Sequence, residues 1–413
     1  MSKNQLNKLL TIGIDNVAIA SSAKKAGYEV CSVDYFCDMD LRRICSECEA
    51  IVDQKPGESS GRISSRMRTE SFLEKAHSLI DRNDMDAILL SSGLDDSCIL
   101  HELNKLAPIL GNPPEVIERV RAKPGFFEEL DALDIPFPKT KVVANFDEAI
   151  EAVLAIGYPV VVKPVKGFGG IGIGIAQDQR ELKRTFEKAS METSVIIQEF
   201  VEGKHASISF LGTSENIKVL TVNEQILGAS FLFQPEIFGY CGNTAPLSLD
   251  EETYDKCVRI VEEISRNFGL KGSNGIDVVI SKDDIPYVVE VNPRFQGSLE
   301  CIEQTLGTNI VEAHINACIH NSLPSIRKRK ITYYTRLVLY APARVIVPDL
   351  TTILGVRDVP LPETIIEKGE PLCSVITGGT SQRTSFHNAR KTAEEIYDLL
   401  QPVPFKEERD LIR

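Results

Sequence analysis

The first 110 residues alternate between short apolar runs and stretches in which apolar side chains recur with helical spacing. The apolar runs predict buried strands at 9–14 (LLTIGI), 28–36 (YEVCSVDYF) and 86–92 (DAILLSS). Residues 16–26 predict a helix that ends at Gly27. Such alternation is typical of a parallel sheet with helices on both faces, so we expect an α/β domain at residues 1–112. No GxGxxG motif follows the first strand, and the pattern does not support dinucleotide binding there.

The remaining chain predicts further modules. Prolines between residues 112 and 139 indicate a junction. Beyond it we expect helices at 146–156, 255–268 and 388–400, and strands at 158–165, 275–280 and 286–291. Asp283 and Asp284 lie between the last two strands, which should therefore pair as a hairpin. A basic run at 327–330 opens a last region rich in β-branched residues and proline.

Composition excludes several classes of protein. Hydrophobic residues make up 43% and charged residues 25% of 413 residues, which is ordinary for a globular protein of two to four domains. A net charge of −13 argues against nucleic acid as a partner. The N-terminus lacks the apolar core of a signal peptide, and no run approaches the roughly 18 apolar residues of a membrane span. We expect a cytoplasmic protein that acts on small molecules.

Ten cysteines are then expected to be reduced and to serve mainly as small buried side chains. Cys45 and Cys48 form one CxxC, with Cys31 and Cys37 upstream. A zinc site usually needs a second ligand pair at matching spacing, and none is obvious.

Three aspartates, Asp34, Asp38 and Asp40, follow the end of the second strand. Sites in open α/β sheets often lie at such strand ends. A solvated loop explains the same acids, and the sequence favours this simpler interpretation.

A glycine-rich segment carries the strongest chemical signal. In YPVVVKPVKGFGGIGIGI, residues 158–175, Lys163 lies near the end of an apolar strand and is followed by Gly167, Gly169, Gly170, Gly172 and Gly174. Glycines let backbone N–H groups approach phosphate oxygens, and a lysine supplies a point charge. The spacing fits neither a Walker loop nor a protein-kinase loop. A glycine-rich hairpin without a ligand remains the alternative.

A second segment, SVIIQEFVEGKH at 194–205, has an apolar strand that leads to Glu199, Phe200 and Val201. A nucleotide base needs an apolar slot with a few polar atoms at its edge, which such a strand end can provide. Taken alone, this signal is weak.

The predicted hairpin carries three oxygen ligands. Glu290 and Asn292 are two residues apart and share one face of their strand, and pairing can place Asp277 beside them. Magnesium prefers such a set, with nucleotide phosphates and water completing its octahedron. Arg294 shares this face if the strand continues, where it could stabilise a transferring phosphoryl group.

In this order and spacing, the segments resemble the ATP-grasp superfamily from about residue 9 to 318. The resemblance implies a Rossmann-like N-terminal domain, a lid subdomain and a C-terminal α+β catalytic subdomain, at residues 1–112, 113–210 and 211–325, with an appendage at 326–413. It implies that Lys123 and Lys163 bind ATP, that Glu199, Phe200 and Val201 contact adenine, and that the glycines at 167–172 belong to a lid at 166–174. It also implies that Mg²⁺, for which Mn²⁺ can substitute, binds Asp277, Glu290 and Asn292, and that Arg294 and Lys163 act in catalysis.

The chain as a whole is similar to an archaeal and methylotroph branch of predicted ATP-dependent carboligases related to biotin carboxylase. The segments 240–247 (YCGNTAPL), 290–300 (EVNPRFQGSLE) and 356–375 carry this looser likeness. Two departures matter. His205 stands where many members have a glutamate for the ribose, so ribose contact falls to Glu202 or His205. Gly297 and Ser298 replace the Val-Glu of biotin carboxylases, which removes the carboxylate associated with bicarbonate activation.

These observations predict an ATP-dependent ligase that joins a carboxylate to an amine, or to a thiol, through an acyl phosphate and releases ADP and phosphate. Occurrence of the branch in methanogens and methylotrophs suggests a role in coenzyme biosynthesis. A bicarbonate-activating enzyme of the biotin carboxylase or carbamoyl phosphate type and a non-catalytic ATP-binding regulator are the alternatives. No membrane partner is expected, and a homodimer stays open.

Overall fold

The computed structural model describes residues 6–63, 68–94, 96–165, 167, 169–190, 194–326 and 331–403. Two positions of the expected lid, 166 and 168, and the basic run at 327–330 lie outside the described residues. None of the helices in the described part of the chain is long and apolar enough to cross a membrane.

The N-terminal domain is a four-stranded parallel sheet in the order β3-β2-β1-β4. Its strands are β1 (Lys8–Gly13), β2 (Glu29–Asp34), β3 (Glu47–Ala50) and β4 (Ala87–Leu90). Helices α1 (Val17–Lys25) and α2 (Met39–Ile44) pack in one core with Leu9 and Val30, and α4 (Thr69–Arg82) and α5 (Ser97–Leu106) pack in another with Leu10 and Ile12. Neighbouring residues of one strand point to opposite faces, so helices cover both faces of the sheet, as the alternating pattern predicted.

The proline-rich segment between residues 112 and 139, expected as a junction, is largely helical. It contains α6 (Pro114–Arg121) and α7 (Gly125–Ala132). Pro114 occupies the first position of α6, where its missing N–H has no helical partner to lose. Val120 and Phe126 are fully buried in the core beneath the central sheet, so this segment is part of the packed body.

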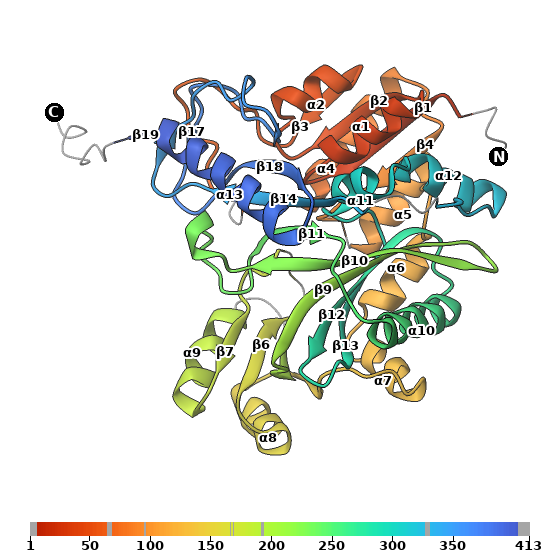
Figure 1. Ribbon diagram of the computed structural model, residues 1–413, viewed down its shortest axis with the longest axis vertical. Helices are drawn as coiled ribbons and strands as arrows, with labels where there is room; N and C mark the ends of the chain where they lie inside the picture. The colour runs from red at the N-terminus through yellow and green to blue at the C-terminus, as the bar shows by residue number, and fades with distance from the viewer. Residues whose placement is uncertain are drawn as a thin grey trace.

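A smaller antiparallel sheet forms the lower lobe in Figure 1, with the strand order β5-β8-β6-β7. Its strands are β5 (Thr140–Val143), β6 (Val160–Pro164), β7 (Gly174–Ala176) and β8 (Val195–Glu199). Helices α8 (Phe146–Ile156) and α9 (Gln179–Ala189) pack on it. Asn145 caps the first turn of α8, which ends at Gly157 with φ +92°, as predicted.

The central sheet has eight strands in the order β13-β12-β9-β10-β11-β14-β18-β16. They are β9 (Gly203–Gly212), β10 (Ile217–Leu227), β11 (Tyr240–Ala245), β12 (Gly272–Ser281), β13 (Pro286–Asn292), β14 (Tyr333–Tyr340), β16 (Val356–Arg357) and β18 (Pro371–Gly379). The predicted hairpin is confirmed as β12 and β13. Around the sheet lie η2 (Ser230–Leu232), α10 (Glu251–Phe268), α11 (Leu299–Leu306), α12 (Ile310–His320) and α13 (Gln382–Leu399).

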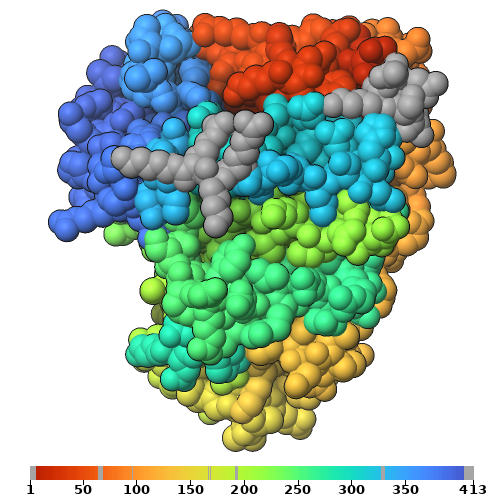
Figure 2. All heavy atoms as spheres, turned by 45° about the vertical axis from the view of Figure 1, so that its right-hand side comes forward, coloured from red at the N-terminus to blue at the C-terminus, as the bar shows by residue number. Residues whose placement is uncertain are grey.

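The C-terminal region is not a separate appendage, because β14, β16 and β18 extend this sheet. A short sheet of β15 (Val345–Ile346), β17 (Ile365–Ile366) and β19 (Gln401–Pro402) adjoins it. Figure 2 shows the C-terminal residues against the N-terminal domain, and the Met39 N–H donates to the Val359 carbonyl. The first and last parts of the chain therefore meet.

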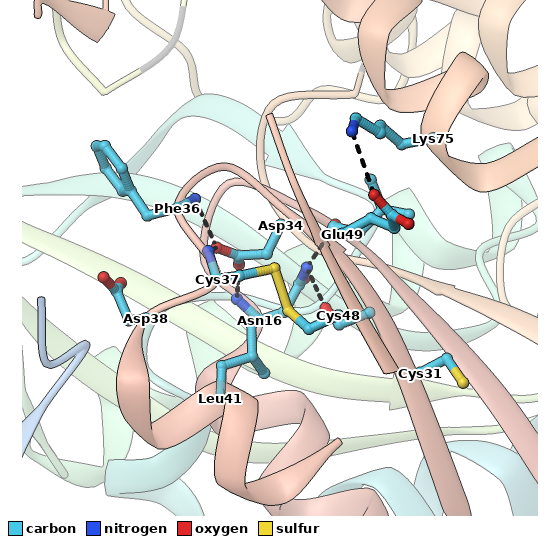
Figure 3. Close-up of a disulfide and its surroundings, with 12 residues drawn as sticks. Asn16, Cys31, Asp34, Phe36, Cys37, Asp38, Leu41, Cys48, Glu49 and Lys75 are labelled. Carbon is cyan, nitrogen blue, oxygen red and sulfur yellow. Dashed lines mark hydrogen bonds and ion pairs between the residues drawn. A yellow bond between two sulfur atoms is a disulfide. The ribbon is translucent and has the colours of Figure 1, made fainter. Parts of the chain in front are cut away.

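One disulfide corrects the expectation that all the cysteines are reduced. Cys37, in the loop after β2, is bonded to Cys48 in β3 (Figure 3). Cys45, which the CxxC spacing had paired with Cys48, is a free thiol, as is the buried Cys31. Parallel pairing of β2 with β3 places the loop that follows β2 next to β3, and this sets Cys48 as the partner of Cys37.

Candidate active site

A cavity of about 1010 Å³ opens among the small sheet, the central sheet and the N-terminal domain. Most of the residues expected at a nucleotide site line it: Lys123, Lys163, Gly167, Gly169, Gly170, Glu199, Phe200, Val201, His205, Asp277, Glu290, Asn292 and Arg294. Two expected residues do not. Glu202 is exposed and forms an ion pair with Lys282, and Gly172 is absent from the lining. Glu202 lies between β8 and β9, and its side chain faces solvent. His205 is therefore the remaining candidate for contact with the ribose.

Two lysines define one end of the cavity. Lys163, in β6, donates to the Gln198 Oε1 on the neighbouring β8 at 2.9 Å. Burial lowers the pKa of Lys163 to about 8. Lys123 follows α6, and its Nζ lies 3.7 Å from the ring centre of Phe126. The pKa of Lys123 is held well below its usual range by burial and then by the nearby charges of Lys163 and Arg121.

Neither lysine has a carboxylate partner within salt-bridge distance among the described residues. Charged ammonium groups out of water are unfavourable, the more so for Lys123 beside other cations, unless an anion joins them. The nucleotide end of the cavity therefore fits a polyphosphate, which would raise both pKa values again.

The glycine-rich loop reaches the cavity through close backbone contact. Gly170 has φ +81°, and a Cβ there would lie 2.0 Å from the Phe238 carbonyl oxygen. The Tyr240 N–H also donates to the Gly169 carbonyl at 3.2 Å. A side chain at position 170 would separate the loop from the 238–240 segment, so glycine is required for this contact.

Hydrogen bonds to neighbouring segments hold the residues at the end of β8 in place. The Glu199 carboxylate accepts from the Lys139 N–H at 3.1 Å, and the Phe200 N–H donates to the Pro159 carbonyl at 3.2 Å. His205 lies half-buried in β9, and burial lowers its pKa, which favours the neutral ring. These residues form a fixed edge to an apolar slot that Ile196 and Val201 also line.

The expected metal ligands lie together on β12 and β13. Asp277 is directly opposite Glu290, and Asn292 lies two residues further on the same face. The Asn292 Nδ2 donates to the Asp277 Oδ2 at 3.1 Å, and the Arg294 Nη2 donates to the Asn292 Oδ1 at 3.1 Å. Burial raises the pKa of Asp277, which a bound cation would lower.

These residues fit a magnesium site that a nucleotide completes. Within the described ranges no group of three or more His, Cys, Asp or Glu side chains could hold a metal alone. Two carboxylates and one amide, next to a space for phosphates, are the donors that Mg²⁺ uses in nucleotide sites.

Two cationic residues were missed in the sequence. Arg121, near the end of α6, forms an ion pair with Glu290. Arg336 lies in β14, is 4% exposed, and lines the cavity. Arg336 interrupts an apolar strand, and a charge buried in such a context needs partners, so this signal could have been found. For Arg121 the sequence holds no comparable signal.

Asp34, Asp38 and Asp40 do not form a solvated loop, contrary to the interpretation that the sequence favoured: Asp34 is the last residue of β2, Asp38 precedes α2 and Asp40 lies in α2. Asp34 is 2% exposed, and Asp34 and Asp38 line the cavity. Burial raises the pKa of Asp34 to about 8, although backbone N–H groups of residues 16, 36 and 37 bond to it. Asp40 accepts from the N–H groups of Asp358 and Val359 at 2.9 and 3.1 Å. These acids face the C-terminal region, which the sequence pattern could not place.

Comparison with known proteins agrees with this architecture. Residues 120–298 match the family model of the ATP-grasp domain. An uncharacterised protein of Methanocaldococcus jannaschii is 29% identical over 375 residues, which cover 89% of this chain and 88% of that protein. The carbamoyl phosphate synthase large chain of Clostridium acetobutylicum is 25% identical over 262 residues, or 62% of this chain. The match spans only 24% of that protein.

Among solved structures, biotin carboxylase from Campylobacter jejuni superposes with a TM-score of 0.72 at 15% identity, covering 96% of this chain and 92% of the other. Likeness at this identity shows the fold. The domain match, the relative of nearly equal length and the shared fold lead to one conclusion. Residues 120–298 form an ATP-grasp domain, in a chain whose overall fold resembles that of biotin carboxylase.

Proposed function

We propose that the protein is an ATP-dependent ligase that activates a carboxylate as an acyl phosphate and joins it to an amine, with release of ADP and phosphate. One observation carries the proposal. A single cavity is lined by Lys123 and Lys163, which have no carboxylate partner among the described residues, and by the facing Asp277, Glu290 and Asn292. This cavity joins a polyphosphate site to a metal site and extends beyond both.

In the proposed reaction, a carboxylate oxygen of the substrate attacks the γ-phosphorus, and the bond from that phosphorus to the β-γ bridging oxygen breaks to give ADP. Lys123 and Lys163 offset the charge of the phosphates, and Arg294 stabilises charge on the transferred group. Bound Mg²⁺, held by Asp277, Glu290 and Asn292, would neutralise phosphate oxygens. The amine then attacks the acyl carbon, the bond to phosphate breaks, and the amine loses a proton.

Closure of the glycine-rich loop supports the same proposal, because a free acyl phosphate hydrolyses. The contact of Gly169 and Gly170 with the 238–240 segment is suited to exclude water from the cavity. The site is less suited to the activation of bicarbonate. Position 298 is a buried serine whose hydroxyl lies 3.3 Å from that of Ser209, so the carboxylate associated with bicarbonate activation is missing.

The test is ADP release with panels of carboxylates, amines and thiols. With the right carboxylate, hydroxylamine should replace the amine and yield a hydroxamate. Oxygen-18 in that carboxylate should be recovered in inorganic phosphate. Label in AMP would contradict the acyl phosphate route, and ADP release that requires bicarbonate alone would identify a bicarbonate-activating enzyme. Mg-ATP binding without turnover on any panel would favour the regulatory alternative.

A further inference from the structure

The cavity continues past the metal ligands to an end that no nucleotide would fill. This end is built by the carboxyl ends of β1 and β2 and by the C-terminal region, and its acidic lining residues are Asp15, Asp34, Asp38 and Asp358. We call it the acidic end. It adjoins the reacting centre, since the Arg336 Nη1 donates to the Gly297 carbonyl at 3.2 Å, three residues after Arg294.

Arg336 already forms ion pairs with carboxylates of the protein. Its Nη2 lies 2.7 Å from the Asp15 Oδ2 and 2.6 Å from the Asp358 Oδ2, and its Nε donates to the Ser374 hydroxyl at 3.1 Å. A guanidinium held in this way is poorly placed to bind an anionic substrate. Arg62, another basic residue of the lining, interacts with Glu370 instead.

Four carboxylates therefore line an end in which Arg336 contacts only two of them, and part of their hydrogen-bonding capacity is unused. The enclosed Oδ1 of Asp15 accepts no hydrogen bond from any described residue. Ser60, which is 9% exposed and lines the same cavity, also has a hydroxyl without a partner in the described part of the chain. Buried polar atoms are rarely left in this state unless a ligand or water completes them. The Asp15 oxygen can accept a hydrogen bond from a ligand, and the Ser60 hydroxyl can accept or donate one. The neighbouring carboxylates favour a donor that is positively charged.

Crowding of like charges supports the same conclusion. The pKa of Asp38 is well above its usual range because of burial and then because of Asp34, Asp358 and Asp40. Burial raises the pKa of Asp15 to about 6, although Arg336 opposes the shift. A second cation in the acidic end would lower these pKa values in the same way.

The disulfide holds this wall in place. Figure 3 shows Asp38 on the opposite side of Cys37 from Cys48, at the start of α2. Cys37 has φ 48°, and its N–H donates to Asp34 at 2.9 Å. Apolar residues Ile14, Val17 and Phe36 line the cavity beside the acids. The acidic end thus combines fixed carboxylates with an apolar surface.

We propose that the acidic end binds the amine substrate as an ammonium group on an apolar body, and that it selects amines without a carboxylate of their own. An amino acid would bring a second negative charge next to Asp38 and Asp15. This inference rests on the proposed ligase function and names the class of its nucleophile. The ammonium would pass one proton to a carboxylate of the acidic end before the neutral amine attacks the acyl carbon.

The experiment measures binding to the full-length protein with Mg-ADP, so it does not depend on turnover. Two matched pairs of probes differ only by a carboxylate: 2-phenylethylamine with phenylalanine, and 1,4-diaminobutane with ornithine. At least one amine should raise Tm and bind at least tenfold more tightly than its amino acid. Asp38→Asn should weaken amine binding roughly tenfold, since it removes a charged partner while its oxygen can still accept from Gln54.

Asp15→Asn serves as the second variant, and exposed Asp131→Asn in α7 is the matched control that should change nothing. Mg-ADP binding should be unchanged in all three. If the amino acids bind as well as the amines, if no probe binds, or if both cavity variants bind amines normally, the inference is wrong while the ligase function stands. If wild-type protein fails to bind Mg-ADP, the proposed function itself is wrong.

Discussion

Lys163 should take up a proton when Mg-ATP binds, and the amount can be worked out from its surroundings. Burial places its pKa at about 8, so at pH 8 about half of the free protein carries a neutral Lys163. Phosphate oxygens would hold the side chain charged in the complex. Binding should therefore take up about half a proton at this residue at pH 8, about 0.9 at pH 9 and close to none at pH 6.5.

Arginine at position 163 isolates this contribution, because a guanidinium stays charged throughout this range. Lys123 is also expected to take up a proton, so the comparison of variant with wild type matters more than the total. Calorimetry in buffers of different ionisation enthalpy gives the proton count. In Lys163→Arg the count should fall by about half a proton at pH 8, whereas exposed Lys183→Arg should leave it unchanged.

Affinity should follow the same titration. As pH rises above 8, the wild-type protein must charge Lys163 in order to bind, so Kd for Mg-ATP should rise by up to about tenfold per pH unit from this group. Lys163→Met should bind weakly at every pH, by roughly 1.5–3 kcal/mol. Equal proton uptake in Lys163→Arg and wild type at pH 8 and 9 would refute the assignment of Lys163 to the phosphate site.

Three further outcomes are expected. Glu290→Gln should abolish turnover and reduce the Tm increase caused by Mg-ATP, with the far-UV circular dichroism unchanged; wild-type turnover would contradict the metal assignment. Reduction of Cys37–Cys48, or its replacement by serines, should lower the free energy of unfolding by about 3 kcal/mol, because a short loop is no longer closed in the unfolded chain, and urea titration would detect it. Gly170→Ala should raise KM for ATP more than Gly167→Ala, since a Cβ at 170 would lie 2.0 Å from a backbone oxygen whereas one at 167 would have no neighbour closer than 3.4 Å; equal KM values would argue against the loop contact.

That the residues expected to bind nucleotide and metal line one cavity could be predicted from the sequence, because they come in short segments with local rules. Glu290 and Asn292 share a face by their spacing alone, and hairpin pairing supplies Asp277. The lysine and glycines of 163–170 likewise lie on one strand and the loop that follows. Glu202 was misplaced for the same reason, since spacing cannot tell which side of a strand end faces solvent.

The acidic end could not be predicted in this way because no segment contains it. Asp15 and Asp38 follow two strands of one sheet, whereas Arg336 lies in a strand of another sheet, 321 residues after Asp15, and Asp358 follows a further strand of that sheet. Only the meeting of the two ends of the chain makes these residues neighbours. The disulfide was missed for a different reason: Cys37 and Cys48 are only 11 residues apart, but the pairing of β2 with β3, rather than any cysteine spacing, brings them together.

Because the two ends of the cavity come from different parts of the chain, the choice of nucleophile could change independently of ATP binding. The residues expected to bind nucleotide and metal lie within residues 120–298, mostly on strands of two sheets or in the loops beside them, and depend on local geometry. The acidic end depends on Arg336, which joins Asp15 of the N-terminal domain to Asp358 and Ser374 of the C-terminal region and to the Gly297 carbonyl beside the metal site. A change of charge there would alter which nucleophile is accepted without touching the phosphate contacts. Substrate choice and ATP use should therefore separate in mutants: Asp38→Asn should raise KM for the amine and leave KM for ATP unchanged, and Lys163→Met should do the reverse.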